Sequence, residues 1–213
     1  MSLPDRLIAA KLRDALGQTL IGRRILVLES TRSTNDFLRQ MLNPELVEGL
    51  VVFAEEQTAG RGRHGRRWAS ASHQGLWFSL LLRPRLSLLE SARLTNWAAQ
   101  AIATAIRDET GLRSTIKPPN DVYLGPRKVA GVLVETVARR GPEYDAIVGL
   151  GINLNQALED FPGELRARAG SLAMVLGRLV DRTSFAIAIL RELERTRETH
   201  LALQASTPIS ANH

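Results

Sequence analysis

Cysteine is absent from the 213-residue chain. Its absence excludes disulfide bonds and thiolate metal sites, and it fits a reducing compartment. The four histidines, His64, His73, His200 and His213, are scattered without the spacing of metal ligands. We therefore expect no metal site built from protein ligands alone.

Long apolar runs are absent as well. No stretch reaches the roughly 18 consecutive apolar residues that a membrane-spanning helix needs. The first residues also lack the apolar core of a signal peptide. We expect a cytoplasmic protein with no membrane partner.

Internal repeats and linker-like stretches are missing too. A length of 213 residues favours one domain and is enough to bury a sizeable core. We expect a single domain over 1–213, with an N-terminal helix and lead-in over about 1–24 and a polar tail over about 204–213. No helix-turn-helix pattern precedes residue 25, so we expect no DNA-binding domain and no repressor role.

The net charge is +6, from 28 basic and 22 acidic residues. A positive excess suits anionic partners such as nucleic acid, nucleotides or an acidic protein. Charge alone does not choose among these partners, so the choice depends on the motifs.

Hydrophobic periodicity predicts helices and strands in a mixed order. Helices are expected over 4–16, from Ser33, over 94–106 with Gly111 as the cap, from 171 to 177, and from about Thr183. Strands are expected over 24–29, 50–54, 76–82, 122–124, 129–137 and 144–154, and the strand over 76–82 is apolar on both faces. The order favours an α+β fold with a mixed, mainly antiparallel sheet and helices covering one side.

The most informative stretch is residues 60–68, which contain three glycines and four arginines. Glycine frees the backbone, and arginine forks match carboxylates and phosphates at any physiological pH. We call this stretch the clamp segment and interpret it as a flexible loop that closes on an acidic ligand. The alternative is a solvated basic loop.

The clamp segment also matches the dinucleotide fingerprint G-x-G-x-x-G, and we reject that interpretation. A polar loop follows the glycines instead of an amphipathic helix, and no acidic residue lies about 20 positions further on. No P-loop and no G-x-S-x-G elbow occurs in the chain.

Three further groups of residues have a structural and a functional interpretation. S-T-N at 33–35 provides a helix cap, and its small polar groups also suit a neutral ligand group such as a urea. K-P-P-N-D at 117–121 is a stiff loop that presents Asn120 and Asp121 in a fixed direction. Lys128 begins an apolar strand beside small residues, either as a solvated strand end or as a charge facing a phosphate.

Two glycines, Gly149 and Gly151, lie in a predicted strand before Asn153 and Asn155. Glycine in a strand marks either a bulge or close approach by a ligand or another backbone. Trp68 follows the clamp arginines and is interpreted either as a base-stacking ring or as core packing, which is the commoner role of tryptophan.

Together these segments resemble the biotin protein ligases. The pieces that match, in order, are S-T-N at 33–35, E-Q-T-A-G-R-G-R-H-G-R-R-W at 56–68, K-P-P-N-D at 117–121, K-V-A-G-V-L-V-E at 128–135 and G-I-N-L-N at 151–155. The resemblance implies a fold related to class II aminoacyl-tRNA synthetases. It also implies two steps, in which biotin and Mg-ATP form biotinyl-5′-adenylate and a lysine of a biotin carboxyl carrier protein then takes the biotinyl group.

The resemblance also implies roles for individual residues. Lys128 and Arg63 are implied as catalytic. The residues that the resemblance implies for binding biotin are Ser33, Thr34, Asn35, Gln57, Gly60, Arg61, Gly62, Arg63, Lys128 and Gly131. The residues that it implies for binding ATP or the adenylate are Arg63, Arg66, Trp68, Asn120, Asp121, Lys128 and Asn153. Mg²⁺ is expected to arrive with ATP, and a homodimer is possible by resemblance alone.

The chain departs from the family pattern in two places. Pro118 stands where the family usually has tryptophan, and the small C-terminal β-barrel of many members is not expected here. Because of these departures, one alternative is that the protein is a relative that binds biotin with weak or no ligase activity. A lipoate ligase-like enzyme is a further alternative. A basic nucleic-acid-binding module is disfavoured, because the arginines lack the interleaved aromatics that stack bases.

Overall fold

The structure is a computed structural model that describes residues 5–141 and 143–201. The polar tail expected from about residue 204 lies outside the described residues, as does the first residue of the helix expected over 4–16.

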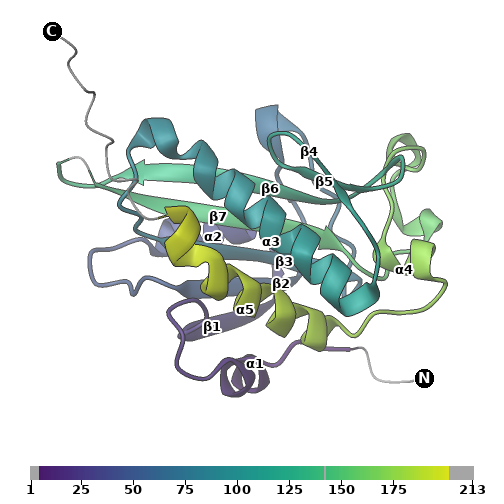
Figure 1. The fold of residues 1–213 in the computed structure, drawn as a ribbon, viewed down its shortest axis with the longest axis horizontal. Helices are drawn as coiled ribbons and strands as arrows, with labels where there is room; N and C mark the ends of the chain where they lie inside the picture. Colours follow the sequence, from purple (N-terminus) through teal and green to yellow (C-terminus); the bar gives the residue numbers. More distant parts are fainter. Residues whose placement is uncertain (1–4, 142, 202–213) are drawn as a thin grey trace, which may run out of the picture.

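A seven-stranded sheet forms the centre of the molecule, with the strand order β1-β2-β3-β7-β6-β5-β4 (Figure 1). Strands β1 and β2 are parallel, and the other neighbouring pairs are antiparallel. The strands are β1 (Arg24–Thr31), β2 (Leu50–Gln57), β3 (Gly75–Leu82), β4 (Thr115–Lys117), β5 (Asp121–Leu124), β6 (Arg127–Ala138) and β7 (Tyr144–Asn153). The predicted fold class, a mixed and mainly antiparallel sheet flanked by helices, is confirmed.

The helices begin and end where the capping signals predict, with one exception. They are α1 (Ala9–Leu16), α2 (Thr34–Met41), α3 (Ala92–Thr110), α4 (Leu172–Leu176) and α5 (Arg182–Leu201). Ser33 caps α2, and Gly111 ends α3 in the left-handed conformation. The first helix starts only at Ala9, because Ile8 is extended and the Leu7 backbone N–H donates to Glu55 rather than joining the helix.

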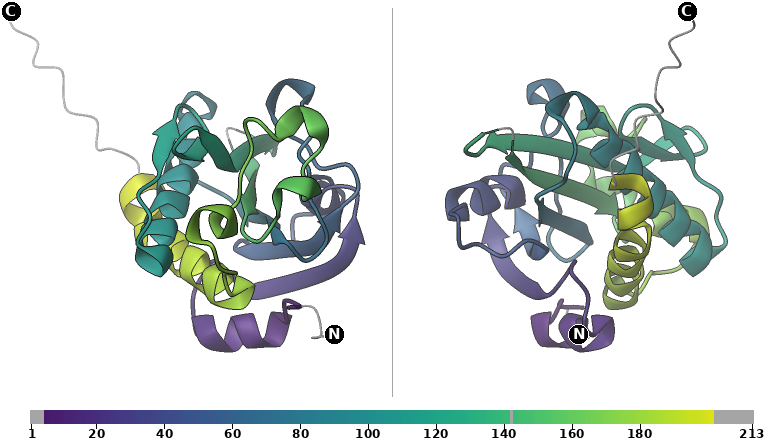
Figure 2. Two further views of the ribbon diagram at one scale, coloured as in Figure 1. Left: turned by 90° about the vertical axis from the view of Figure 1, so that its right-hand side faces the viewer. Right: turned by 60° about the vertical axis from the view of Figure 1, so that its left-hand side comes forward.

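Helices cover both faces of the sheet, so the expectation that they cover one side is wrong. Helices α3 and α5 lie side by side on one face, and α2 lies on the other (Figures 1 and 2). The reason lies in the central strands, which are apolar on both sides. In β2, Val51 and Phe53 pack in the larger core with α3 and α5, while Leu50 and Val52 pack in a smaller cluster with Leu38 of α2.

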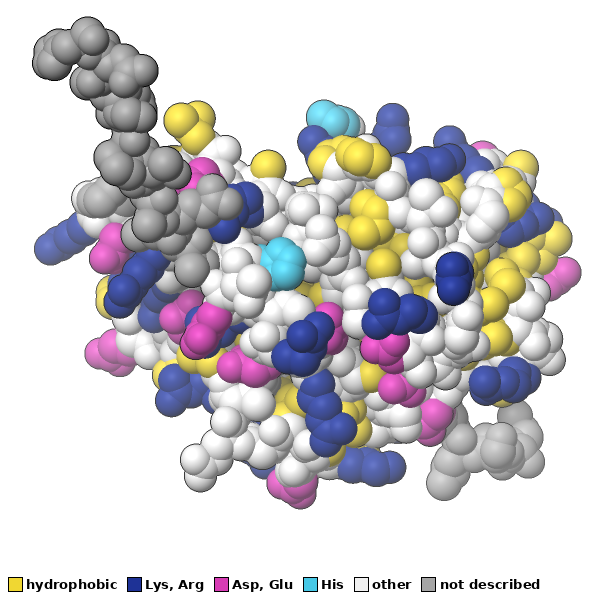
Figure 3. Space-filling model, viewed as in Figure 1, with side chains coloured by type: hydrophobic (Ala, Val, Ile, Leu, Met, Phe, Trp, Pro, Cys, Tyr) yellow, Lys and Arg dark blue, Asp and Glu magenta, His cyan; other side chains and the backbone are white. Residues whose placement is uncertain are grey.

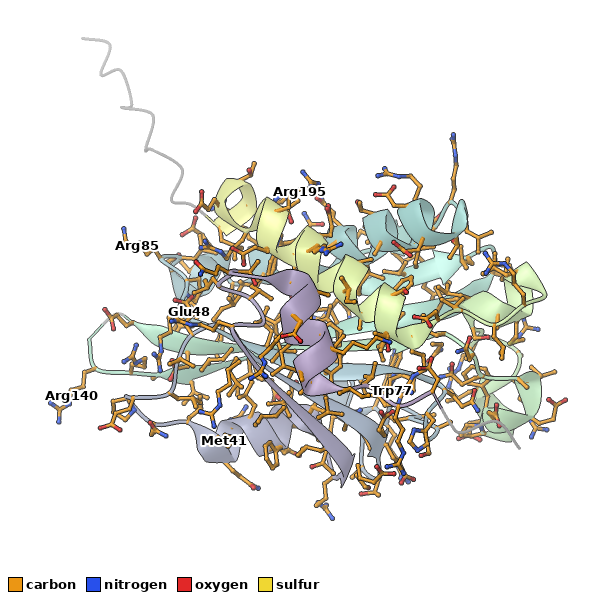
Figure 4. All side chains as sticks on the ribbon, turned by 90° about the horizontal axis from the view of Figure 1, so that it is seen from below. Met41, Glu48, Trp77, Arg85, Arg140 and Arg195 are labelled. Atoms are coloured by element: carbon orange, nitrogen blue, oxygen red, sulfur yellow. The ribbon has the colours of Figure 1, made fainter. Side chains whose placement is uncertain are left out.

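The burial of individual side chains agrees with this arrangement of sheet and helices. Trp77 of β3 lies in the interior, whereas Arg140 and Arg195 project outward (Figure 4). On the face that carries α3 and α5, basic and acidic side chains are intermixed (Figure 3). None of the helices in the described part of the chain has the length and apolarity that a membrane span requires.

Candidate active site

A cavity opens on the sheet face that carries α2, where the start of that helix meets β6 and β7. It holds about 50 Å³. The predicted site residues that line it are Ser33, Thr34, Asn35, Gln57, Arg61, Gly62, Arg63, Trp68, Asn120, Lys128 and Gly131. Small-molecule sites usually hold several hundred Å³, so the clamp residues in its wall must shift to admit a ligand of that size.

Two glycines of β7 form part of the cavity wall. A Cβ atom on Gly149 would lie 2.2 Å from Asn35 Oδ1, and one on Gly151 would lie 2.5 Å from Trp68 Cε2. The pairing of β7 with β3 is continuous from Asn153 to Ala146, so the bulge interpretation is wrong. The alternation of a strand places residues 149 and 151 on one face, and their missing side chains leave room for Asn35 and Trp68.

The inner end of the cavity, at the start of α2, is lined by neutral polar side chains, with the Arg61–Glu135 ion pair beside it. Ser33, Thr34 and Asn35 are buried at the start of α2. Thr34 donates its backbone N–H to Gln57 Oε1 at 2.9 Å, and Gln57 Nε2 donates to Ser70 Oγ at 2.9 Å. These bonds fix the orientation of the Gln57 amide. Both interpretations of S-T-N are compatible with the structure, since Ser33 Oγ also caps α2 by accepting from the Asp36 N–H at 3.4 Å.

Ser79 of β3 is fully buried outside the cavity wall, where it supports this polar end, and it was not predicted from the sequence. Its hydroxyl lies 2.7 Å from Thr34 Oγ1 and 2.6 Å from Asn35 Oδ1. A single polar residue inside a fully buried apolar strand is a signal that could have found it, because a buried hydroxyl requires hydrogen-bond partners.

The outer end of the cavity is cationic. Lys128 Nζ is 2.6 Å from Asp121 Oδ1 and 5.3 Å from the centre of the Trp68 ring. Arg63 donates to Asn120 Oδ1 at 3.4 Å. Lys128 and Arg63 therefore line the same cavity, together with Arg61.

Arg61 is held differently from the other two cations. Its Nη2 lies 2.6 Å from Asp36 Oδ1 and 2.7 Å from Glu135 Oε2. The guanidinium thus joins the clamp segment to α2 and β6. Neither Asp36 nor Glu135 was predicted from the sequence to belong to the site, although Glu135 ends one of the quoted motifs.

The clamp segment is folded back on itself. Gly62 N–H donates to Arg66 O at 2.7 Å, and Trp68 N–H donates to Gly60 O at 2.9 Å. Between them His64 and Gly65 take left-handed backbone angles, with φ of 56° and 71°. This turn sets the clamp segment apart from a plain solvated loop.

Trp68 contributes to both a packed and an accessible surface. Its ring meets Trp77 edge to face, with centroids 6.3 Å apart, and it also lines the cavity. The buried indole Nε1 has no hydrogen-bond partner among the described residues.

Four predicted site residues lie outside the cavity wall. Gly60 and Arg66 line a second cavity of about 270 Å³ on the clamp segment, and Asp121 reaches the site through its ion pair with Lys128. Asn153 is buried, donates to Gly170 O at 2.9 Å and accepts from Gln156 at 3.1 Å. The structure thus engages the Asn153 amide in holding the segment after β7, and a role at the adenine stays a prediction.

No cluster of three or more metal-ligating side chains occurs among residues 5–141 and 143–201. Asp121 is a carboxylate beside the cationic end of the site. It is the kind of hard oxygen ligand that Mg²⁺ accepts while it keeps water and phosphate oxygens.

Residues 27–153 match the model of the Biotin/lipoate A/B protein ligase family. The chain belongs to this family. Its mixed sheet with flanking helices is the fold of the solved biotin protein ligases, which is like that of class II aminoacyl-tRNA synthetases.

Several named proteins are similar to the chain. The bifunctional ligase/repressor BirA of Bacillus subtilis is 34% identical over 206 residues, covering 97% of this chain and 63% of BirA. The biotin–[acetyl-CoA-carboxylase] ligase of Mycobacterium tuberculosis is 32% identical, covering 89% of this chain and 72% of that protein. The structure of biotin protein ligase from Aquifex aeolicus in complex with biotin and ATP aligns with a TM-score of 0.71 and 32% identity, over 84% of this chain and 72% of that one. The chain thus spans less than two thirds of the length of BirA.

Proposed function

We propose that this chain carries the catalytic centre of a biotin protein ligase. It activates biotin with ATP to biotinyl-5′-adenylate and transfers the biotinyl group to a lysine of a carrier protein. The names of the relatives support this activity, and an acetyl-CoA carboxylase carrier protein is the partner that they favour.

The observation that carries the proposal is the division of one cavity into a neutral polar end and a cationic end. The polar end offers Ser33, Thr34 and Asn35, and the cationic end offers Arg63 and Lys128. Biotin has the same division, with an uncharged ring urea at one end, an apolar chain and a carboxylate at the other. This division of the cavity suits a ligand that is neutral and polar at its head and anionic at its tail.

The first step is difficult because two anions must meet. A carboxylate oxygen of biotin attacks the α-phosphorus of ATP, and pyrophosphate leaves with the bonding electrons. Lys128 and Arg63 provide positive charge at the end of the cavity where this charge develops. Mg²⁺ bound to ATP would further neutralise the phosphates, and Asp121 is the residue that would hold it.

The second step transfers the acyl group. The amine of the carrier lysine attacks the acyl carbon of the adenylate, AMP leaves with the bonding electrons, and the amine loses a proton. Water would hydrolyse the same mixed anhydride. The cavity wall includes Arg61, Gly62, Arg63 and Trp68 of the clamp segment, which exclude water until the carrier arrives.

The test is calorimetry with biotin, followed by ATP, and then incubation with Mg-ATP and a biotin carrier domain. We expect biotin binding, release of pyrophosphate and a labelled carrier. Biotin binding without pyrophosphate release would favour a non-ligating relative, and preference for lipoate would favour a lipoate ligase-like enzyme. Absence of binding to either acid would refute the proposal.

A further inference from the structure

Glu135 of β6 contacts three side chains, two of which, Asn35 and Arg39, lie on α2 and one of which, Arg61, lies in the clamp segment. Its Oε2 lies 2.7 Å from Asn35 Nδ2 and 2.7 Å from Arg61 Nη2, and its Oε1 lies 3.0 Å from Arg39 Nη2. Only 17% of the Glu135 side chain is exposed. A carboxylate with so little access to water needs partners of this kind, because it has lost most of its hydration.

The contact with Asn35 fixes which way the Asn35 amide faces, together with a longer hydrogen bond from Asn35 Nδ2 to the Leu133 carbonyl at 3.4 Å. An ionised carboxylate only accepts hydrogen bonds, so Asn35 must present its NH₂ group to Glu135. The Asn35 carbonyl oxygen then faces the opposite way, 2.6 Å from Ser79 Oγ. Rotating the amide by half a turn would set its carbonyl oxygen against the carboxylate and its NH₂ group against Ser79.

The orientation of this amide sets the hydrogen-bonding polarity of the inner end of the cavity. With Oδ1 toward Ser79, Asn35 offers an acceptor there, which suits the N–H groups of a ring urea. With the amide reversed, an N–H donor of the ligand would meet another donor. A mismatch of this kind leaves buried polar groups unpaired and costs affinity.

The contact with Arg61 links the same carboxylate to the clamp segment. Arg61 also pairs with Asp36 at 2.6 Å, so it keeps one carboxylate when Glu135 is neutralised. Glu135 therefore connects Asn35, at the polar end of the cavity, to the clamp segment.

Resting on the proposed function, we propose that Glu135 is a positioning residue for the ligase reaction. It orients the Asn35 amide for the urea of biotin and anchors the clamp segment through Arg61.

The first test compares Glu135→Gln with wild type by calorimetry. Loss of a charged hydrogen bond and of the fixed amide is expected to weaken biotin binding about tenfold to a hundredfold. ATP affinity should change less than about twofold, because Glu135 contacts Asn35, Arg39 and Arg61 rather than Lys128 and Arg63. Arg39→Gln is the matched control, since it removes the third partner of Glu135 and leaves Asn35 and Arg61 in place; it should bind biotin like wild type.

The second test exchanges the two polar groups. In Asn35→Asp, two carboxylates face each other, so biotin binding should weaken by at least as much as in Glu135→Gln. In the double variant Asn35→Asp/Glu135→Gln, the new amide donates to the new carboxylate and the total charge is that of wild type. We expect biotin affinity to recover to within about fivefold of wild type.

The clamp role gives a separate measurement. The double variant restores the Asn35 contact but leaves Arg61 with Asp36 alone, so the adenylate should still dissociate several-fold faster than from wild type. Full recovery of adenylate retention in the double variant would overturn the anchoring role.

The outcomes separate this inference from the proposed function. If wild type binds neither biotin nor its adenylate, the proposed function fails. If wild type binds biotin and Glu135→Gln binds it equally well, the positioning role is overturned. A fall in thermal stability of Glu135→Gln with unchanged biotin affinity would likewise assign Glu135 a purely structural role.

Discussion

Gly149→Ala is the change for which the structure gives the sharpest steric expectation. The new Cβ would lie 2.2 Å from Asn35 Oδ1, 3.0 Å from Cγ and 3.1 Å from Nδ2. Gly149 does not adopt a positive φ, so alanine suits the strand backbone and the clash is purely with Asn35. Either the Asn35 side chain moves or the sheet shifts, and each response disturbs the polar end of the cavity.

The expected cost follows from the contacts that Asn35 would lose. Overpacking a well-packed interior costs about 1–3 kcal/mol. Separating Asn35 from Ser79 and Glu135 adds about 1 kcal/mol of net hydrogen-bond free energy. We expect Gly149→Ala to lower the free energy of unfolding by about 2–4 kcal/mol in urea denaturation, and to weaken biotin binding at least about tenfold.

The controls isolate the steric cause. Gly163→Ala adds the same methyl group where no heavy atom lies within 4 Å, so its stability should stay within about 0.5 kcal/mol of wild type. In an Asn35→Ala background the clash is gone, so the additional cost of Gly149→Ala should fall well below its cost in wild type. An undiminished cost in that background, or wild-type stability and biotin affinity of Gly149→Ala itself, would refute the reasoning.

Three further predictions concern other parts of the molecule. Lys128→Ala should lower the rate of pyrophosphate release about 100-fold or more while the circular dichroism stays unchanged; a wild-type rate would exclude its catalytic role. Arg182→Met leaves the buried Glu55 carboxylate without its guanidinium partner. The free energy of unfolding measured by urea denaturation should fall by about 3–5 kcal/mol. A decrease below about 1 kcal/mol would contradict the expectation. The Ser184 N–H donates to the Asp181 carboxylate at 2.6 Å and lowers the pKa of that carboxyl from its ordinary 3.8. Asp181, which caps α5, therefore stabilises the fold above pH 3.8. This stabilisation is lost as the pH falls through the lowered pKa. Asp181→Ala should thus cost about 1 kcal/mol at pH 7 and less in acid, and a cost that stays constant into acid would contradict this.

Much of the fold followed from local signals. Gly111 and Gly177 end α3 and α4 in the left-handed conformation, as glycine does after a helix. The apolar run over 76–82, interrupted only by Ser79, predicted a central strand, and β3 is fully buried between β2 and β7. Such signals are local because a cap or a strand face depends on residues a few positions apart.

The layering of the helices was not predicted, because it depends on contacts between distant segments. The apolar stripe of α2 is visible in the sequence, yet the sequence does not say which sheet face it covers. That choice is made by Leu50 and Val52 of β2 together with Ile147 of β7, which pack with Leu38 on the face opposite α3 and α5.

The sequence by itself determined which chemical groups this protein has available: the clamp arginines, Lys128, the S-T-N turn, and the glycines at 149 and 151. Residue type and short spacing fix those properties, since charge, hydrogen-bonding capacity and the lack of a Cβ atom belong to the residues themselves. Only the tertiary structure decided that Ser79 and Glu135 set the surroundings of Asn35, that Arg61 is occupied by two carboxylates, and that the Asn153 amide is engaged by its neighbours. Those facts depend on side chains up to about 100 residues apart meeting within 3 Å, and sheet register and packing alone bring them together.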